Sequence, residues 1–370
     1  MASAPLAQPL TLQQLEVAHF KNQHGHYTFA PKLTCITGLN GIGKTNLLDA
    51  IYLLALTKSR FQKSDPDLIA YGQDYYRVAG TFALGDDALQ VSLAYRRGER
   101  KIFKDNGLVA ERLADHIGKV PVVFVNPDDT PLVRGGAEER RKFFDNLLSQ
   151  SSAPYLAALL KQNRLLQQRN ALLATLAERR STDMTLLDTY DEPLLEAFMV
   201  LARERAACLA EFMPPFIDYY ARLSHGREVP DIQYQTQVLE PDFARHYHLS
   251  RSRDLAAGRT LLGAHRDEFE LLMGGQPVRK TGSQGQQKTF LLALKLAMHD
   301  YLAARTHRLP LLLLDDIYER RDETRIGGLL GLIAQGRLGQ AFVTEATGER
   351  MRRVVAQAGL ADEAGWIALD

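Results

Sequence analysis

The feature that most constrains this chain is a glycine-rich stretch that fits the pattern G-x-x-x-x-G-K-[ST], Gly38-Leu39-Asn40-Gly41-Ile42-Gly43-Lys44-Thr45. Before it, residues 33–37 are apolar and β-branched, which predicts a buried strand. After it, apolar residues recur at helical spacing as far as Leu54. A strand, a glycine turn and a helix in this order are the context in which the pattern forms a phosphate-binding P-loop. The flanking strand and helix argue against the alternative, a chance glycine turn.

The residue types in this loop explain how it would hold a nucleotide. Glycines let backbone N–H groups curl around an anion. The start of the next helix adds free N–H groups and the positive end of its dipole. We expect Lys44 to reach the β- and γ-phosphates and the Thr45 hydroxyl to bind Mg²⁺. Residues 38–46, which end at Asn46, are therefore the predicted nucleotide-binding residues, with ATP and Mg²⁺ as cofactors.

Composition excludes several classes of protein. The 370 residues are 45% hydrophobic and 24% charged, as is ordinary for a globular protein, and a net charge of +1 favours no partner. The two cysteines, Cys35 and Cys208, make neither a disulfide framework nor a metal cluster, which favours a reducing compartment. Residues 1–9 do not resemble a signal peptide, and no apolar run is long enough to span a membrane. We therefore expect a cytoplasmic protein of two or three domains.

Hydrophobic periodicity divides the chain into three parts. Residues 77–104 alternate with a period of two between turn residues, which predicts an antiparallel meander. From about Gly135 the apolar positions follow a helical period, and Pro214-Pro215 is expected to end the last long helix. One further helix is expected over residues 241–256. We predict an α/β fold with an ATPase domain at 9–128, an inserted all-α domain at 129–249, and the rest of the ATPase domain at 250–370.

Two acidic residues follow an apolar strand late in the chain. Residues 311–314 are four leucines, and Asp315 and Asp316 come directly after them. This is a Walker B pattern, in which the strand presents its carboxylates beside the P-loop. We expect Asp315 to hold Mg²⁺ through water, and Asp316 to orient or deprotonate the attacking water, with Lys44 as the other catalytic residue. Alone the pattern is weak, because any buried strand can end in acids.

A further motif opens a helix shortly before the Walker B strand. It contains Ser283, Gly285 and Gln286 in the order Ser-x-Gly-Gln. In ABC-type ATPases this signature binds the γ-phosphate held by the partner subunit, again with a helix N-terminus that faces an anion. An ordinary serine N-cap is the alternative. The order and spacing before Walker B favour the signature, and with it an ABC/SMC-like ATPase head that carries a helical insert.

Together these motifs resemble the RecF family of bacterial recombination proteins over nearly the whole length of the chain. The resemblance is carried by segments 38–52, 59–60, 67–69, 126–129, 140–145, 263–267, 283–287 and 313–316. It implies a slow, DNA-stimulated ATPase of recombinational repair and replication restart. It also implies an ATP-dependent homodimer, in which each nucleotide lies between one P-loop and the other signature. The expected partners are duplex or gapped DNA and the proteins RecR and RecO, which together load RecA.

The resemblance adds site residues and shows three departures. The family's Q-loop-like position falls at residues 126–129, where Asp128 and Asp129 would sense Mg²⁺ or nucleotide. In the segment Gly263-Ala264-His265-Arg266-Asp267, alanine replaces the family's proline. The dimer-coupling D-loop retains Asp322 and loses its leucine, and Thr347 stands where relatives often have a switch histidine. For the pair His265 and Arg266, a structural role remains as open as a functional one.

Two alternatives to the DNA-binding ATPase stay open, and no DNA contact is assigned. One alternative is an ABC-type ATPase that drives an unrelated partner, which a hydrolysis rate indifferent to DNA would favour. The other is an adaptor with a degenerate ATP site, in which loss of Lys44 would change nothing. Arg60 is a candidate for nucleotide or DNA contact, and so are the basic residues of segments 140–142 and 164–169, although such residues more often form solvated helix faces.

Overall fold

A computed structural model describes residues 7–179, 184–224, 228–316 and 323–369. The chain forms two compact units. Unit 1 comprises Met1–Asp129 and Lys295–Asp370, and unit 2 comprises Thr130–Leu294. The expected boundary near residue 128 lies beside the first division. Segment 250–294, which we assigned to the ATPase domain, belongs by its contacts to unit 2, because its strand β10 pairs with β9 of the helical part.

Unit 1 contains a five-stranded parallel sheet that carries both phosphate-site motifs. Its strands are short, and all except the edge strand at residues 364–368 are almost entirely buried, as is typical of parallel strands covered on both faces. In order across the sheet they are β15 (Ala364–Ala368), β3 (Leu33–Thr37), β14 (Ala341–Glu345), β13 (Leu311–Leu314) and β8 (Val122–Val125). The strands predicted at 33–37 and 311–314 are confirmed with the same bounds. Strand β14 separates them, so the P-loop and Walker B follow strands that are not neighbours.

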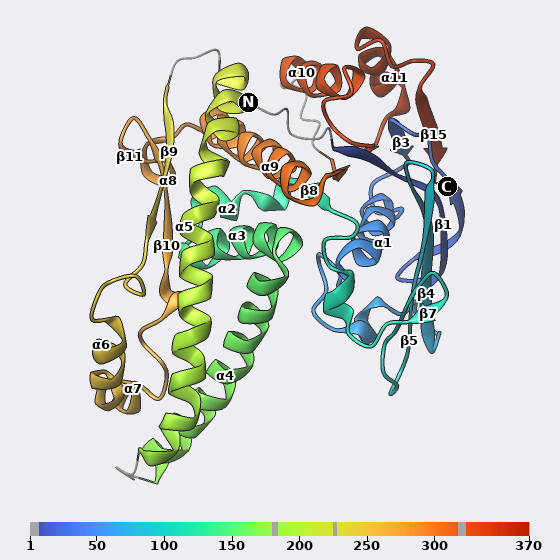
Figure 1. The fold of residues 1–370 in the computed structure, drawn as a ribbon. Coiled ribbons are helices and arrows are strands. Elements are labelled where there is room, and N and C mark those ends of the chain that lie inside the picture. Colours follow the sequence, from blue (N-terminus) through green and yellow to red (C-terminus); the bar gives the residue numbers. More distant parts are fainter. Residues whose placement is uncertain (1–6, 180–183, 225–227, 317–322, 370) are drawn as a thin grey trace. The chain divides into compact units, whose positions relative to one another are not determined.

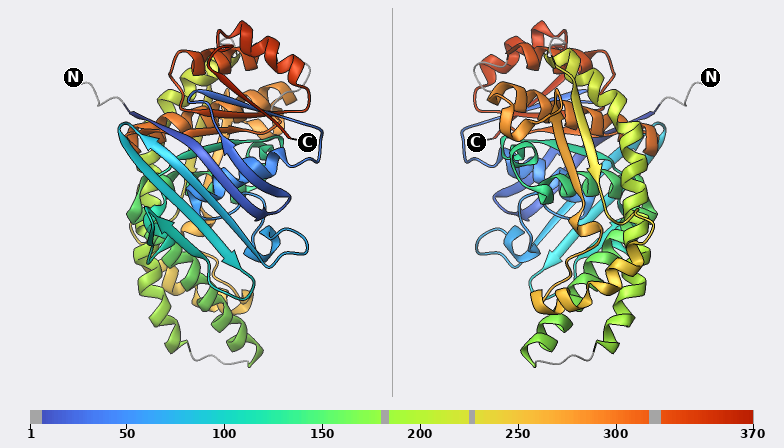
Figure 2. Two further views of the ribbon diagram at one scale, coloured as in Figure 1. Left: turned by 90° about the vertical axis from the view of Figure 1, so that its right-hand side faces the viewer. Right: turned by 90° about the vertical axis from the view of Figure 1, so that its left-hand side faces the viewer.

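The second sheet of unit 1 contains the meander predicted for residues 77–104, which forms β4 to β6. Its strands are β1 (Gln8–Phe20), β2 (Gln23–Thr28), β4 (Tyr75–Leu84), β5 (Asp87–Arg96), β6 (Ile102–Asp105) and β7 (Leu108–Val109), all antiparallel, with β12 (Arg308–Leu309) parallel to β1. The left view of Figure 2 shows β1, β2, β4 and β5 side by side. Helix α1 (Lys44–Leu56) contacts both sheets, and every residue from Leu47 to Leu56 is buried. A helix apolar on all sides needs such an enclosed place.

The C-terminal part of unit 1 completes the parallel sheet. Helices α10 (Glu323–Ala334) and α11 (Gly348–Gln357) pack against each other, and β15 adds an edge strand beside β3. Neither α11 nor β15 was predicted from the sequence. In the first part of unit 1, short 3₁₀-helices lie in the connections between α1 and β4 and between β7 and β8, and directly after β8. They are η1 (Asp65–Leu68), η2 (Leu113–His116) and η3 (Pro127–Asp129).

Unit 2 is mainly helical (Figure 1). Helices α4 (Ala153–Glu178) and α5 (Asp188–Ser224) pack along each other, and α3 (Ala137–Ser151) packs on both. A small antiparallel sheet of β9 (Pro230–Gln235), β10 (Glu268–Met273) and β11 (Gln276–Pro277) accompanies them, and β9 lies along α5 (Figure 2, right). The remaining elements are α2 (Pro131–Arg134), η4 (Thr185–Leu187), α6 (Phe243–Leu249), α7 (Arg251–Ala257), η5 (Ala264–Arg266), α8 (Val278–Thr281) and α9 (Gln284–Thr306). Helix α9 is divided between the units, because its residues from Lys295 onward belong to unit 1.

Two predictions for unit 2 are wrong. Helix α5 continues through Pro214 and Pro215 to Ser224. An internal proline costs about 3 kcal/mol, but buried aromatic side chains on both sides of the pair, among them Phe212, Phe216 and Tyr220, hold the helix together. The single helix expected over 241–256 is two short helices, α6 and α7, separated at Ser250.

Within the described ranges, no helix has both the length and the apolar character needed to cross a bilayer.

Candidate nucleotide-binding site

The loop between β3 and α1 needs glycine at Gly38 and Gly43, for their backbone conformation and for lack of space. Gly38 and Gly43 have φ angles of 154° and 110°, which residues with a side chain rarely adopt. A Cβ atom on Gly38 would lie 2.6 Å from the carbonyl oxygen of Leu369, and one on Gly43 would lie 2.2 Å from Nε2 of Gln23. Backbone and side-chain atoms of other segments therefore pack closely against these two glycines, while Leu39, Asn40 and Gly41 are exposed.

The loop and the first turn of α1 supply donors for an anion. The Lys44 side chain is buried, and its Nζ donates to the carbonyls of Gly38 at 2.7 Å and Leu39 at 3.1 Å. Leu47 donates its N–H to Gly43 at 3.0 Å. Among the described residues, no carbonyl receives the N–H groups of Lys44, Thr45 or Asn46. An ammonium group and free N–H groups at a helix N-terminus fit a phosphate chain.

The two motifs meet at the carboxyl edge of the parallel sheet. The Thr45 hydroxyl lies 2.8 and 3.0 Å from the two carboxylate oxygens of Asp315, although 270 residues separate them. Burial raises the pKa of Asp315, while hydrogen bonds from Thr344 and Thr45 counteract the rise. A hydroxyl and a carboxylate are hard oxygen ligands of the kind that Mg²⁺ prefers. This donor set fits a magnesium ion that bound phosphates would complete.

Sequence reasoning missed Thr344, which joins the two Walker B aspartates. Its buried hydroxyl donates to Asp315 Oδ1 at 2.8 Å and accepts the N–H of Asp316 at 2.8 Å. The cause is strand order, because β14 lies between β3 and β13 and ends at the same edge. The available signal was a polar residue at the end of an otherwise apolar strand.

We expect Thr344→Val to slow ATP hydrolysis and to raise the Mg²⁺ concentration needed for half-maximal rate, each by about tenfold to a hundredfold. Valine keeps the volume but removes a hydrogen bond to a buried charge, worth about 1.5–3 kcal/mol. The measurement is the rate of ATP hydrolysis as a function of Mg²⁺ concentration. Thr34→Val is the matched control, because Thr34 is buried in β3 and its hydroxyl accepts the N–H of Ala30, at 3.1 Å, away from Asp315. An unchanged Mg²⁺ dependence in Thr344→Val would remove Thr344 from the site.

Asp316 is exposed and has a left-handed backbone conformation, and its exposure suits a residue that activates a water molecule. Its side chain is exposed at the edge of the sheet, and its φ angle of 45° is left-handed. Aspartate and asparagine adopt this region more readily than other residues with a side chain. Asp322, the predicted D-loop residue, lies outside the described residues.

The predicted Q-loop residues differ in their surroundings. Asp128 is exposed on η3, whereas Asp129 is buried and lies 2.8 Å from the ammonium group of Lys295. Arg60 forms an ion pair with the same carboxylate. Burial alone would raise the pKa of Asp129, but the charges of Lys295 and Arg60 outweigh it and hold the pKa below its ordinary value. Asp129 is therefore the buried centre of an ion-pair network with Lys295 and Arg60, whereas Asp128 and the outer part of Arg60 are exposed to solvent.

The predicted switch position lies at the same edge of the sheet. Thr347 is exposed just before α11 and caps it without a side-chain bond. Glu345, two residues earlier, is buried at the end of β14. Its Oε1 accepts the N–H of Ala346 at 3.0 Å, and its Oε2 has no hydrogen-bond partner among the described residues. A third carboxylate at this edge, beside those of Asp315 and Asp316, was not predicted.

The signature residues lie in unit 2 at the start of α9. The Ser283 hydroxyl accepts the N–H of Gln286 at 3.3 Å, and the Gln286 side chain accepts the N–H of Ser283 at 2.6 Å. This is a reciprocal capping box, so the serine N-cap that we kept as an alternative is present. Gln286 also donates to Glu228. Gly285 is the second residue of α9, so the first turn of the helix has no side chain at this position.

The segment that contains His265 and Arg266 is held by internal hydrogen bonds. His265 is largely shielded, and its Nε2 lies 3.2 Å from the carbonyl of Thr260. Burial lowers the pKa of His265 to about 4, so the imidazole is neutral at physiological pH. Arg266 reaches the same carbonyl at 3.5 Å. Both side chains therefore make hydrogen bonds of the kind expected for a structural role, which was one of the two roles considered for this pair.

A P-loop and a Walker B aspartate at one edge of a parallel sheet, beside an antiparallel sheet, define a P-loop ATPase head of the ABC/SMC class. The model of the RecF/RecN/SMC N terminal domain matches residues 11–367. The chain belongs to the RecF family.

Relatives and solved structures agree with this assignment. The DNA replication and repair protein RecF of Cytophaga hutchinsonii is 39% identical over 92% of this chain and 90% of its own length. The protein of the same name from Bacteroides fragilis is 36% identical, with 95% and 94% covered. A structure of the recombination mediator RecF with ATP has a TM-score of 0.84 at 26% identity and covers 92% of this chain and 93% of its own. An SMC head domain from Pyrococcus furiosus, 18% identical with a TM-score of 0.52 and coverage of 92% and 91%, shares the fold.

Proposed function

We propose that this protein binds and slowly hydrolyses ATP, and that ATP controls its binding to DNA in replication and recombinational repair. The observation that carries the ATPase proposal is the contact between Thr45 of the P-loop and Asp315 of Walker B. In the proposed roles, the N–H groups of the loop and Lys44 hold the phosphates. Thr45 and Asp315 hold Mg²⁺, and Asp316 accepts a proton from water.

We further propose that ATP joins two copies of the chain head to head. The support is the pairing of a P-loop with an ABC-type signature in one chain, because ABC-type ATPases complete each site with the partner subunit's signature. Ser283 stands at the N-terminus of the long helix α9, where N–H groups can face an anion. Hydrolysis would then separate the copies and release DNA.

Gapped duplex DNA, RecO and RecR are the proposed partners, and loading of RecA is the proposed outcome. The support is family membership together with the RecFOR pathway named for the solved RecF structures. A cytoplasmic location is part of the same proposal.

The test is binding of the Asp316→Asn chain to a gapped duplex with ATP and then with ADP, at fixed salt, because phosphate contacts depend on salt. Sedimentation of the same samples reports the dimer. We expect tight binding and dimerisation with ATP only. Equal DNA binding with both nucleotides would remove the switch but keep the DNA role. No DNA binding with either would favour an ABC-type ATPase that drives another partner.

A further inference from the structure

Two side-chain amides lie directly behind the P-loop. Asn22 and Gln23 follow one another where β1 turns into β2. Nδ2 of Asn22 donates to the carbonyl of Ile42 at 2.9 Å, and Nε2 of Gln23 donates to the carbonyl of Gly43 at 3.2 Å. The hairpin of the antiparallel sheet is thereby bonded to two consecutive peptide groups of the loop.

The orientation of both amides is fixed by further partners. Oδ1 of Asn22 accepts from Nδ2 of Asn46 at 2.7 Å and from Nε2 of Gln23 at 3.3 Å. Oε1 of Gln23 accepts from the Tyr27 hydroxyl at 2.9 Å. Each nitrogen and oxygen of the two amides has a partner of the right kind, so neither amide can flip without loss. Gln23 is buried, whereas Asn22 is exposed.

These bonds set the direction of the donors that would face a phosphate. A trans peptide group is planar, so its C=O and N–H bonds point in opposite directions. An amide that holds the Ile42 carbonyl on one side of the loop therefore directs the N–H of Gly43 to the other side. In the same way, the bond to the Gly43 carbonyl directs the N–H of Lys44 away from the hairpin.

The geometry of Gly43 agrees with this arrangement. A Cβ atom at this position would lie within 2.2–2.6 Å of the side-chain atoms of Asn22 and Gln23. The glycine of the motif is thus needed at this point for the approach of the amides as well as for its left-handed φ angle.

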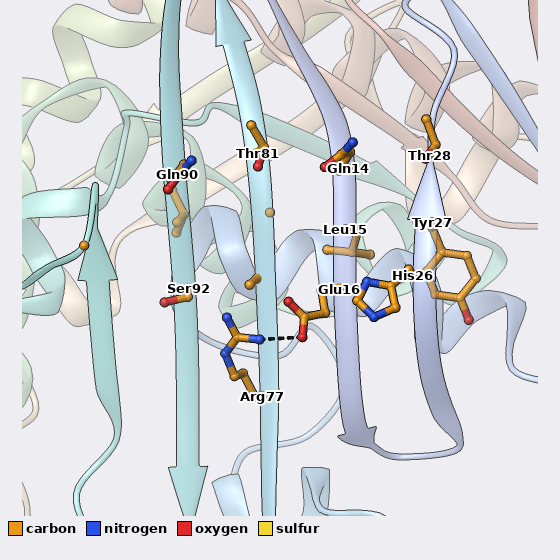
Figure 3. A pocket seen from close by; sticks show the side chains of 14 residues that line it. Gln14, Leu15, Glu16, His26, Tyr27, Thr28, Arg77, Thr81, Gln90 and Ser92 are labelled. Carbon is orange, nitrogen blue, oxygen red and sulfur yellow. Dashed lines mark ion pairs between the residues drawn. The ribbon is translucent and has the colours of Figure 1, made fainter.

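We propose that Asn22 and Gln23 form an amide clamp that holds the P-loop in its phosphate-binding shape without touching the nucleotide. They are positioning residues, and this inference rests on the proposed ATP-binding function. Tyr27 is the outer member of the clamp. It lines a polar hollow of 530 Å³ on the antiparallel sheet (Figure 3).

Three variants test the clamp. Asn22→Asp sets a carboxylate oxygen against the Ile42 carbonyl, Gln23→Met removes the bond to Gly43 at similar size, and Tyr27→Phe removes only the outer hydrogen bond. Gln14→Met is the matched control, because Gln14 is exposed on β1. Displacement of a fluorescent ATP analogue gives dissociation constants for ATP, ADP and inorganic tripolyphosphate. Thermal unfolding without nucleotide is measured alongside.

We expect Asn22→Asp and Gln23→Met to weaken ATP, ADP and tripolyphosphate by the same factor of about ten, and Tyr27→Phe by about threefold, as lost hydrogen bonds predict. The control stays at the wild-type values. Loss of affinity for ATP with unchanged tripolyphosphate binding would mean direct contact with the nucleoside and would overturn the clamp, as would unchanged affinity for all three ligands. If Gln23→Met is unstable, the test rests on Asn22→Asp, because a substitution at the exposed residue Asn22 does not disturb the core. A wild-type chain that binds no ATP would instead refute the proposed function.

Discussion

Replacement of Asp316 by asparagine is expected to slow ATP hydrolysis by about 10²–10⁴-fold, the usual contribution of a general base, and to leave ATP affinity nearly unchanged. The side chain is exposed at the edge of the sheet and bonds no part of the P-loop in the described structure. Asparagine tolerates the left-handed φ angle of 45° as well as aspartate does, and the backbone N–H keeps its bond to Thr344. Single-turnover hydrolysis and equilibrium ATP binding measure the two effects separately.

The neighbouring carboxylate provides the control. Asp315→Asn changes a buried group that bonds Thr45 and Thr344, so we expect it to weaken Mg²⁺-dependent ATP binding as well as hydrolysis. The two variants therefore differ in binding and not only in rate. A wild-type rate in Asp316→Asn would show that another group activates water. Glu345, a buried carboxylate at the same edge with one unpartnered oxygen among the described residues, would then be the next residue to change.

Local patterns were sufficient to predict the parts of the fold that local chemistry determines. Strand β3, the glycine turn and α1 are contiguous, and their residue types match their surroundings. The four leucines of β13 and the alternating residues of the meander are similar cases, since burial on two faces or on one gives a distinct period. The predicted meeting of P-loop and Walker B needed only the rule that parallel strands end at one edge.

The residues that the sequence did not reveal are those positioned by contacts between distant segments. Thr344 reaches Asp315 because β14 lies between β3 and β13, and strand order is not visible in a single sequence. Asn22 and Gln23 reach the loop because a hairpin turn brings two polar residues beside it. In a sequence, each of these residues looks like an ordinary polar residue at the end of a strand.

Helix α5 illustrates the opposite error, in which a strong local signal was overridden. Two consecutive prolines normally end a helix, yet here the aromatic side chains around them are buried on one face. The gain from that burial, about 1.5–3 kcal/mol for each large apolar side chain, offsets the local cost of about 3 kcal/mol for each proline. Tertiary packing decides such cases, and a pattern of single residues does not contain it.

The second large effect is expected in unit 2, where Arg205→Met should lower the stability of the fold by about 3–5 kcal/mol. The buried guanidinium lies 2.8 Å from Asp267 Oδ2, 2.8 Å from Asp145 Oδ1, 2.9 Å from the Tyr155 hydroxyl and 2.6 Å from the Ala264 carbonyl. Methionine fills the space but leaves two carboxylates without their cation. The segment 263–267, which carries part of the family resemblance, is thus tied to α3, α4 and α5 through one side chain.

Arg222→Met on the same helix is the matched control. Its ion pair with Asp218, at 2.7 Å, is about half exposed on both sides, so solvent screens it and its loss should change the stability far less than the loss of Arg205. Thermal unfolding of the whole chain, followed by helical circular dichroism, measures both. At about 2–4 °C per kcal/mol for a domain of this size, Arg205→Met should lower the midpoint by about 10 °C. Equal midpoints for the two variants would refute the structural role of Arg205.

The pH dependence of the Arg205→Met defect identifies its cause. Burial raises the pKa of Asp267, and Arg205 and Tyr234 counteract that rise in the wild-type chain. Without the guanidinium the pKa of Asp267 rises further above its unfolded value of about 3.9. A carboxyl whose pKa is raised by folding destabilises the fold as the pH rises and does so least below its unfolded pKa. The difference in midpoint between Arg205→Met and the wild type should therefore shrink as the pH falls towards 4. A difference independent of pH would instead point to lost packing and not to an uncompensated charge.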